Sequence, residues 1–374
     1  MKKLIPALIG ITFMIVLFFN NKINANQKNE SHLELKNLEA SATSKDPILG
    51  DFLEPVKLTS QNSLIKSSDI GEIVDMAIID SYLISDEIFS DKIFKLYNLR
   101  TGKLISNFIN KGKGPNEMLY PEAINYYKPD FFTLFDGNKR ELIYFSLNEI
   151  LNKNYRFYNK KKVEAEGFWV SKSYLLNDSL LLCTGFFKKG QYLLYDLNSK
   201  TFNNFLDYPP DEKLKGVTNE IKGRAFQGQI SVRPNGGKFA NATRGVFEIC
   251  EIKNADIKRI FRKTYFSPEC KIIHNNVAFS SASPYGFHSI TSTDSYIFLI
   301  YSERSMKEYG DEYYAGNNLL VFDWDGNPVV NFILDRYLKN FALDVSQMKI
   351  YGFCTNSNSG EPEIVTYQLP PIKE

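Results

Sequence analysis

The side chains best suited to chemistry are scattered along the chain, and none of them forms a known catalytic motif. Histidine is scarce: beyond residue 45 only His274 and His288 occur, which is too few for a three-histidine metal site. The sequence contains no GxSxG elbow, HExxH motif, P-loop or dinucleotide-binding fingerprint. Asp and Asn are plentiful, so a metal site built from carboxylates is still possible. Most of these Asp and Asn residues, however, occupy turns where their side chains bind local backbone. We therefore expect no cofactor and favour a protein without catalytic activity.

A glycine-rich segment at residues 110–117 is the most unusual short stretch. Two glycines and a proline within it allow a tight turn between two strands. No strand-then-helix context follows, so it is not a phosphate-binding loop. Its simplest role is structural, but Lys113 and Glu117 are candidate ligand-binding residues if the turn lies at the mouth of a channel.

Four further residues are candidates for ligand binding. Arg224 and Arg233 have planar guanidinium groups that suit a carboxylate or phosphate, or that pair with neighbouring acidic side chains. Tyr285 and His288 precede an apolar strand at the same relative place as the glycine-rich segment. Aromatic rings at such a place suit a sugar or a peptide.

The elements that must position these residues are predicted by a turn signal that recurs about every fifty residues. Each turn is rich in Asp, Asn, Gly or Ser and leads into an apolar strand. The six turns lie at Asp80, Asp130, Asp178, Asn235, Asp294 and Asp344. The high counts of Tyr (22) and Phe (29) favour β-structure. A period of this length with a hairpin in every unit predicts the blades of a β-propeller.

A second, outer hairpin follows the first in five of the six units. The clearest case joins the apolar runs 94–99 and 104–108 through a turn at 100–103. Another contains Asp325-Gly326 between two apolar runs, a strong hairpin signal. The sixth unit ends at Pro370-Pro371 without its outermost strand, and a strand near Phe52 to Leu58 is available to fill the gap. We therefore predict an all-β, six-bladed propeller with four-stranded antiparallel blades, in which an N-terminal strand completes the last blade and removes an open edge.

Two polar, charged insertions interrupt the period. They span Pro209 to Gly228 and Ser302 to Asn318, and the second contains the pair Tyr313-Tyr314. Long loops on a rigid scaffold often carry binding function. Simple solvated loops are an equally good interpretation from sequence alone.

The first residues read as a targeting signal. Two lysines precede an uncharged apolar stretch that is shorter than a spanning helix requires. We expect a signal peptide at 1–25, a flexible tether at 26–45 and one propeller domain at 46–374, with no membrane span in the mature chain. An uncleaved N-terminal anchor is the alternative.

Charge and cysteine content narrow the classes of partner. The formal net charge is only +2, which argues against a nucleic acid as the partner. Export permits disulfides between the four cysteines. Three of these cysteines lie in apolar strand patterns, so buried free thiols are the favoured interpretation.

The segment Gly112-Lys113-Gly114-Pro115-Asn116-Glu117 resembles the GxGPxE signature of the exported TolB-like six-bladed β-propeller family of Bacteroidota. Through the repeat spacing, the resemblance covers nearly the whole chain after the tether. It implies the propeller fold and export, but no particular reaction. Family lipoproteins carry a lipobox cysteine, and residues 1–30 contain none, so we expect a periplasmic or cell-surface protein without a lipid anchor.

Two functions from different classes are consistent with these features. The favoured one is an exported, non-catalytic binding or scaffold protein that recognises a peptide, glycan or partner protein through loops at the channel mouth. The alternative is a propeller hydrolase or lyase, similar to lactonase-type enzymes, with a divalent cation in the central channel. A purely structural propeller is a third possibility.

Overall fold

The computed structural model describes residues 48–372 except 88, 165–168, 204–205, 209, 227, 268 and 274–275. The expected signal peptide, the expected tether and His274 therefore lie outside the described residues. Within the described part of the chain, no helix is long and apolar enough to cross a membrane.

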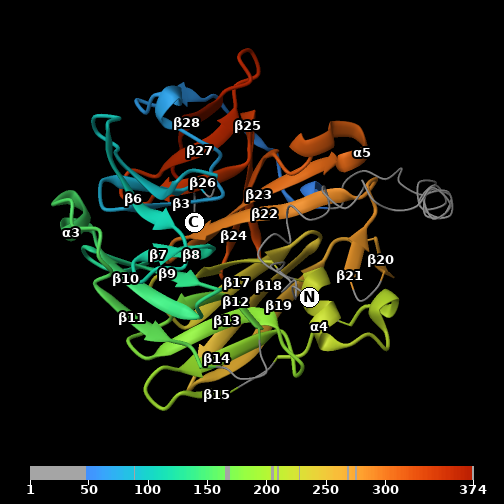
Figure 1. Ribbon diagram of the computed structural model, residues 1–374. Helices are drawn as coiled ribbons and strands as arrows, with labels where there is room; N and C mark the ends of the chain where they lie inside the picture. The colour runs from blue at the N-terminus through green and yellow to red at the C-terminus, as the bar shows by residue number, and fades with distance from the viewer. Residues whose placement is uncertain are drawn as a thin grey trace, which may run out of the picture.

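Six antiparallel sheets follow one another along the chain and are arranged as six blades (Figure 1). Blade one comprises β3 (Asp75–Ile79), β4 (Tyr82–Asp86), β5 (Lys92–Asn98) and β6 (Leu104–Lys111), with β7 (Glu117–Met118) added in parallel. Blade two comprises β8 (Pro121–Lys128), β9 (Phe131–Asp136), β10 (Glu141–Ser146) and β11 (Asn159–Lys162). Blade three comprises β12 (Trp169–Leu175), β13 (Leu180–Phe186), β14 (Tyr192–Asp196) and β15 (Thr201–Asn203).

The second half of the ring repeats the same order. Blade four comprises β16 (Gln229–Val232), β17 (Lys238–Thr243), β18 (Val246–Lys253) and β19 (Asp256–Thr264). Blade five comprises β22 (Pro284–Ser292), β23 (Tyr296–Ser305), β24 (Gly316–Asp323) and β25 (Pro328–Leu338). Blade six comprises β26 (Asn340–Asp344), β27 (Lys349–Thr355) and β28 (Pro362–Gln368). All six predicted turns connect the first and second strands of a blade.

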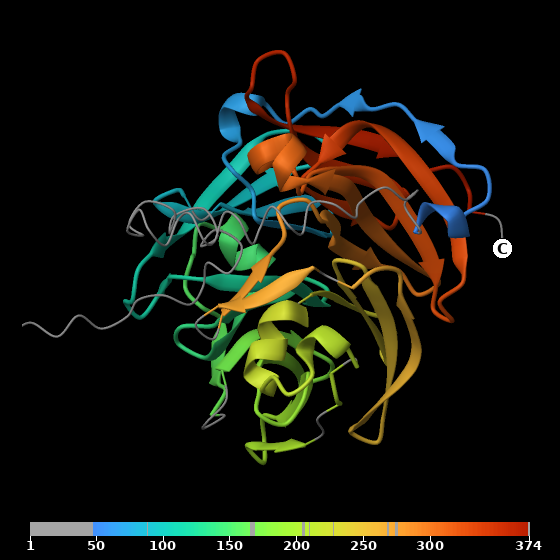
Figure 2. The same ribbon diagram turned by 90° about the vertical axis from the view of Figure 1, so that its right-hand side faces the viewer.

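Helices and one extra hairpin lie between these strands. The helices are α3 (Leu147–Leu151), α4 (Asn219–Phe226) and α5 (Met306–Tyr309), with the short 3-10 turns η2 (Leu49–Asp51), η3 (Ser67–Asp69), η4 (Glu212–Leu214) and η5 (Gly310–Glu312). The hairpin of β20 (Cys270–Ile273) and β21 (Asn276–Phe279) was not expected from the sequence. It lies with α4 and α5 on one side of the propeller, which faces the viewer in Figure 2 and which we call the helical face.

The N-terminal strand that completes the last blade is confirmed, but its position differs from the prediction. The closing strand is β2 (Gln61–Asn62), which pairs antiparallel with β28. The predicted segment lies just before it and contains β1 (Val56–Leu58), which pairs in parallel with β25 of blade five. Figure 2 shows this blue segment running along the outside of the orange and red blades. One continuous segment therefore covers the edges of two blades.

The hydrophobic core is divided among the contacts between neighbouring blades. Blades one and two share a cluster that includes Phe94 and Phe132, and blades six and one share another that includes Phe353 and Tyr97. Because the middle strands have a neighbour on both faces, they read as nearly continuous apolar runs. The strand Phe131–Asp136 is buried at every position but the first.

The recurring aspartate has a backbone role at two of the blade turns. Asp80 and Asp130 adopt positive φ angles of 52° and 68°. Aspartate tolerates this left-handed region better than most residues with a β-carbon. The turn signal in the sequence therefore marks positions where the chain reverses tightly.

All four cysteines are free thiols, and Cys183, Cys250 and Cys354 are buried. This matches the favoured interpretation of cysteines that pack as small apolar side chains.

Candidate functional site

The first strands of the six blades surround a central cavity of about 1780 Å³. Contacts run from β26 to β3, from β3 to β8, from β8 to β12, and from β16 through β22 to β26. The cavity wall includes residues at both ends of these strands, so the cavity extends along the channel. Met306, Glu312 and Tyr313 border it at the helical face. We call this end the helix-side mouth.

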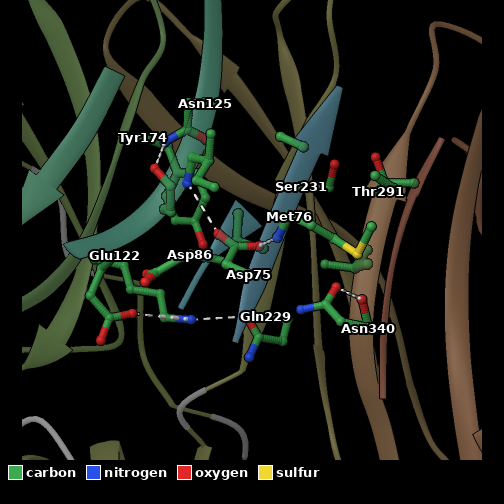
Figure 3. Close-up of a pocket in the computed structure, with 18 of the residues that line it drawn as sticks. Asp75, Met76, Asp86, Glu122, Asn125, Tyr174, Gln229, Ser231, Thr291 and Asn340 are labelled. Carbon is green, nitrogen blue, oxygen red and sulfur yellow. Dashed lines mark hydrogen bonds and ion pairs between the residues drawn. The ribbon is translucent and has the colours of Figure 1, made fainter. Parts of the chain in front are cut away.

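Three carboxylic acids from two blades lie together near the helix-side mouth (Figure 3). Asp75 begins β3 and Asp86 ends β4, and the register of these antiparallel strands places the two residues directly opposite each other. Glu122, on the neighbouring β8, is close enough to act electrostatically on both. We call these three residues the carboxylate cluster.

The three acids have different partners. The Asp75 carboxylate accepts hydrogen bonds from the backbone N–H groups of Met76 (2.9 Å) and Ile124 (3.1 Å). Asp86 is only 2% exposed, and its Oδ1 has no hydrogen-bond partner among the described residues. A buried polar atom without a partner carries a desolvation cost, which a bound ligand can repay.

Burial raises the pKa of Asp86 well above its ordinary value, and the negative charges of Asp75, Glu122 and Glu87 raise it further. Lys111 opposes this shift only in part. Burial also raises the pKa of Asp75 and of Glu122. The cluster therefore favours sharing a proton, or binding a cation, over carrying its full negative charge.

Lys172 on β12 is the basic residue that pairs with Glu122. Its ammonium group lies 3.6 Å from Glu122 and donates a hydrogen bond of 2.9 Å to Gln229. Burial alone would lower the pKa of Lys172, but Glu122, Tyr174 and Asp75 together outweigh that effect and the pKa is raised. Lys172 is therefore a charged partner of the cluster and is poorly suited to act as a neutral nucleophile.

Aromatic side chains form the opposite part of the helix-side mouth. Tyr285 and His288, both on β22, have ring centroids 5.7 Å apart. Tyr313 packs edge-on against Tyr285 at 5.0 Å, and Tyr314 follows at 6.3 Å. Tyr285 and His288, which the sequence indicated as candidates, thus lie in one aromatic group. Tyr313 and Tyr314 of the insertion at 302–318 complete this group.

His288 is a second buried polar group that faces the cavity. It is 8% exposed, and neither ring nitrogen makes a hydrogen bond of good geometry within the described structure. Burial lowers the pKa of His288 to about 4, and weak hydrogen bonding to the backbone of Leu338, Gly286 and Lys339 offsets this only in part. The imidazole is therefore neutral near pH 7 and can both donate and accept one hydrogen bond.

The insertion at 302–318 is fixed to the blades beside it. Tyr314 Oη lies 3.3 Å from Glu72, and Lys339 bridges Glu72 (3.3 Å) and Glu312 (3.2 Å). These contacts join blade five to the segment that enters blade one. The insertion is therefore part of the cavity wall.

The glycine-rich segment is folded on itself. Glu117 accepts a hydrogen bond from the backbone N–H of Gly114 (2.8 Å), and a β-carbon at Gly112 would collide with the Glu117 carboxylate. Lys139 donates hydrogen bonds of 2.6 Å to the carbonyl oxygens of Gly114 and Glu117. Lys113 is exposed, and both Lys113 and Glu117 lie outside the cavity wall.

Comparison with known proteins agrees with this architecture. A family model described as TolB-like 6-blade propeller-like matches residues 51–346. The chain belongs to this TolB-like family. The family resemblance inferred from the glycine-rich segment and the repeat spacing is thereby confirmed.

Two solved structures from Bacteroides are similar to this TolB-like chain in fold. A Bacteroides fragilis protein named as exported is 11% identical over 90% of this chain and 98% of its own, with a TM-score of 0.51. A member of the DUF4221 family from Bacteroides vulgatus is 10% identical over 85% of this chain and 96% of its own, with a TM-score of 0.53. No curated protein matches the sequence.

The two predicted arginines lie apart from the carboxylate cluster and from each other. Arg224, on α4, donates a hydrogen bond to Asn276 (2.8 Å) and lies over the ring of Phe186. Arg233 follows β16 at the other end of the cavity, where its Nε donates to the carbonyl oxygen of Asp294 (2.8 Å). Both guanidinium groups thus have partners within the TolB-like fold. The described part of the insertion at 209–228 reaches the cavity wall only through Gly228.

Sequence reasoning did not select the carboxylate cluster or Lys172. The sequence did contain a signal for this site, because Asp86 and Lys172 are charged residues within otherwise apolar or weakly polar strands. The sequence does not show that these residues and Glu122 lie together, because they come from three different blades of the ring.

No set of three His, Cys, Asp or Glu side chains within the described residues is grouped in a way that could hold a metal ion. The negative charge of the carboxylate cluster thus suits a cation, but its three acids are not arranged to coordinate a metal ion. No observation favours the lactonase-like alternative over binding.

Proposed function

We propose that this TolB-like propeller is an exported, non-catalytic binding protein that takes part of a peptide, glycan or partner protein into its central cavity through the helix-side mouth. The observation that carries the proposal is Asp86 Oδ1, a buried oxygen in the cavity wall that has no hydrogen-bond partner among the described residues. The buried His288 ring, which also lines the cavity and makes no hydrogen bond of good geometry there, supports it. In a folded protein such groups cost free energy unless a ligand or water satisfies them.

The rest of the mouth supplies the other features of a ligand pocket. Tyr285, Tyr313 and Tyr314 offer apolar ring faces together with hydroxyl groups. A mixture of ring faces and a few fixed polar groups is typical of pockets that orient a ligand. The cavity of about 1780 Å³ is large enough for several sugar rings or amino-acid residues.

Export is supported by the expected signal peptide and by the fold similarity to a protein named as exported. A periplasmic or cell-surface location follows from this proposal. A binding protein at either place meets peptides and glycans outside the cytoplasm.

The proposal is tested by filling the cavity. Thr291 on β22 lines it (Figure 3), and tryptophan is well tolerated in strands. The purified propeller and its Thr291→Trp variant are screened against a glycan array and a displayed library of random peptides. Thr201→Trp is the matched control, because Thr201 is exposed on the outer strand β15 of blade three.

We expect the wild type and Thr201→Trp to retain the same glycans or peptides, and Thr291→Trp to lose them by about tenfold or more. Circular dichroism and thermal unfolding check that all three proteins are folded. Equal capture by Thr291→Trp would contradict the proposal, as would the absence of any capture by the wild type.

A further inference from the structure

The carboxylate cluster is built around an unfavourable pair of like charges. Asp75 and Asp86 are direct cross-strand partners in the β3–β4 hairpin, and like charges in this arrangement destabilise a sheet. The two-residue turn at Asp80-Ser81 fixes this register. The pair is therefore a permanent feature of blade one.

The surrounding basic residues do not balance the acids. Within the described residues, Glu87 is paired with Lys95 (2.7 Å), and Glu122 with Lys172 (3.6 Å). Lys111 is the remaining ammonium group that acts on Asp86. With every carboxyl group ionised, these four carboxylates would face three ammonium groups, so the group either carries one negative charge in excess or holds a proton in its place.

The unsatisfied atom lies where a ligand can reach it. Asp86 forms part of the cavity wall, and Figure 3 shows it beside Asp75 and Glu122 at the pocket. Its Oδ1 has no partner in the described part of the chain, although the residue is only 2% exposed. This oxygen can accept a hydrogen bond from a donor that enters the cavity.

We propose that Asp86, beside the negative charge of its cross-strand partner Asp75, binds a positively charged organic group of the ligand, an ammonium or a guanidinium. This inference rests on the proposed function, because it names the chemistry of the ligand that enters the cavity. Such a group supplies the missing positive charge and donates charge-assisted hydrogen bonds to Asp86. Tyr174 lines the cavity beside the cluster (Figure 3), and its aromatic ring suits contact with a cation.

An organic cation fits better than a metal ion. A divalent cation needs several oxygen ligands at short, regular distances, and no described group of acids provides them. Asp75 already uses both carboxylate oxygens to bind backbone N–H groups. An ammonium needs only one free acceptor and the negative field of its neighbours.

The same arrangement links binding to a proton. Burial raises the pKa of Asp86. The charges of Asp75, Glu122 and Glu87 raise this pKa further, and Lys111 lowers it. A bound ammonium favours the ionised carboxylate, so Asp86 releases its proton when the cation binds. We therefore expect the affinity for a cation to increase with pH.

Isothermal titration calorimetry with putrescine tests the inference, and 1,4-butanediol is the neutral compound of matched length. The proteins are the full propeller, Asp86→Asn, and the control Asp91→Asn, which removes an exposed carboxylate of the same blade. We expect putrescine to bind and butanediol not to bind. Asp86→Asn should weaken binding by about tenfold or more, Asp91→Asn should not, and the affinity should rise from about pH 5 to about pH 8.

Several results would overturn the inference. These are equal binding of the diamine and the diol, no binding of putrescine, unchanged affinity in Asp86→Asn, and displacement of putrescine by Ca²⁺ bound at the same acids. Its failure is distinguishable from failure of the proposed function. If Asp86→Asn still captures the glycans or peptides that Thr291→Trp loses, cavity binding stands and only the cationic group is wrong.

Discussion

Asp75 joins blade one to blade two, because its carboxylate accepts a hydrogen bond of 3.1 Å from the backbone N–H of Ile124. The same carboxylate binds the N–H of Met76 at 2.9 Å. Asp86, directly opposite on β4, has an oxygen without such a partner among the described residues. Two aspartates of one register pair therefore have different roles: Asp75 holds the mouth together, and Asp86 is available to a ligand.

The first prediction follows from this difference. Asp75→Ala leaves two backbone donors without their acceptor and should lower the free energy of unfolding by about 1–3 kcal/mol. Asp86→Asn removes a charge opposite Asp75 and breaks no hydrogen bond of its Oδ1. It should therefore change stability by less than about 0.5 kcal/mol or increase it. Urea unfolding of both variants measures this, and equal losses would contradict the assignment of roles.

The second prediction concerns pH and Asp86. A carboxyl group whose pKa is raised on folding binds more protons in the folded state than in the unfolded state. Its contribution to stability is complete below the unfolded pKa and is lost as pH rises through the folded pKa. The free energy of unfolding should therefore fall less steeply with rising pH in Asp86→Asn than in the wild type. Urea titrations at a series of pH values measure the slope, and parallel slopes would exclude this effect.

The third prediction concerns His288, for which the sign is opposite. Its pKa is lowered from 6.5 to about 4 on folding. Between these two pH values the unfolded chain therefore binds a proton at this residue that the folded state does not. Stability is lost as pH falls from about 6.5 toward 4, by about 3 kcal/mol at most. His288→Phe should remove this loss, because phenylalanine has no group that titrates in this range. A variant that kept the acid-induced loss would show that another group causes it.

The fourth prediction tests whether the glycine-rich segment is a self-contained turn. Gly112→Ala places a methyl group against the Glu117 carboxylate and should destabilise the fold by about 1–3 kcal/mol. In a Glu117→Ala background the same change should cost at least about 0.5 kcal/mol less, because the clash is absent. A double-mutant cycle from urea unfolding measures this coupling. Additive effects would mean that Glu117 is not what requires glycine at position 112.

The fifth prediction concerns closure of the ring by the N-terminal segment. Asp335 on β25 accepts hydrogen bonds from Ser60 N (3.0 Å), Ser60 Oγ (3.1 Å) and Tyr367 Oη (2.9 Å). Asp335→Ala should loosen β2 and increase amide hydrogen exchange in β2 and β28. Asp325→Ala, in an exposed outer turn, is the control. Unchanged exchange in the Asp335 variant would show that the backbone pairing alone holds the closing strand.

The blade pattern could be predicted from sequence because its signals are local. Each inner hairpin combines a turn-forming residue such as Asp80 or Asp130 with an adjacent apolar strand, and both features lie within ten residues. The closing strand was placed too early, at 52–58, because those residues are more apolar than Gln61-Asn62. In the fold, β1 pairs in parallel with blade five, a contact for which the antiparallel blade pattern gives no signal.

The site could be predicted only in part, because it depends on contacts between blades. Tyr285 and His288 were found from their position relative to a strand. The pairing of Asp75 with Asp86 follows from the two-residue turn between their strands, since turn length sets register. Glu122 comes from another blade, and neither propensity nor spacing gives its distance from Asp75.

Cavity binding is tested by a crystal structure of the propeller with the peptide or glycan that it retains on the array. We expect ligand density inside the central cavity, with a polar atom within hydrogen-bond distance of Asp86 Oδ1 or of the His288 ring. Ligand bound on the outer surface of the blades, with only solvent next to Asp86 and His288, would show that the cavity is not the binding site.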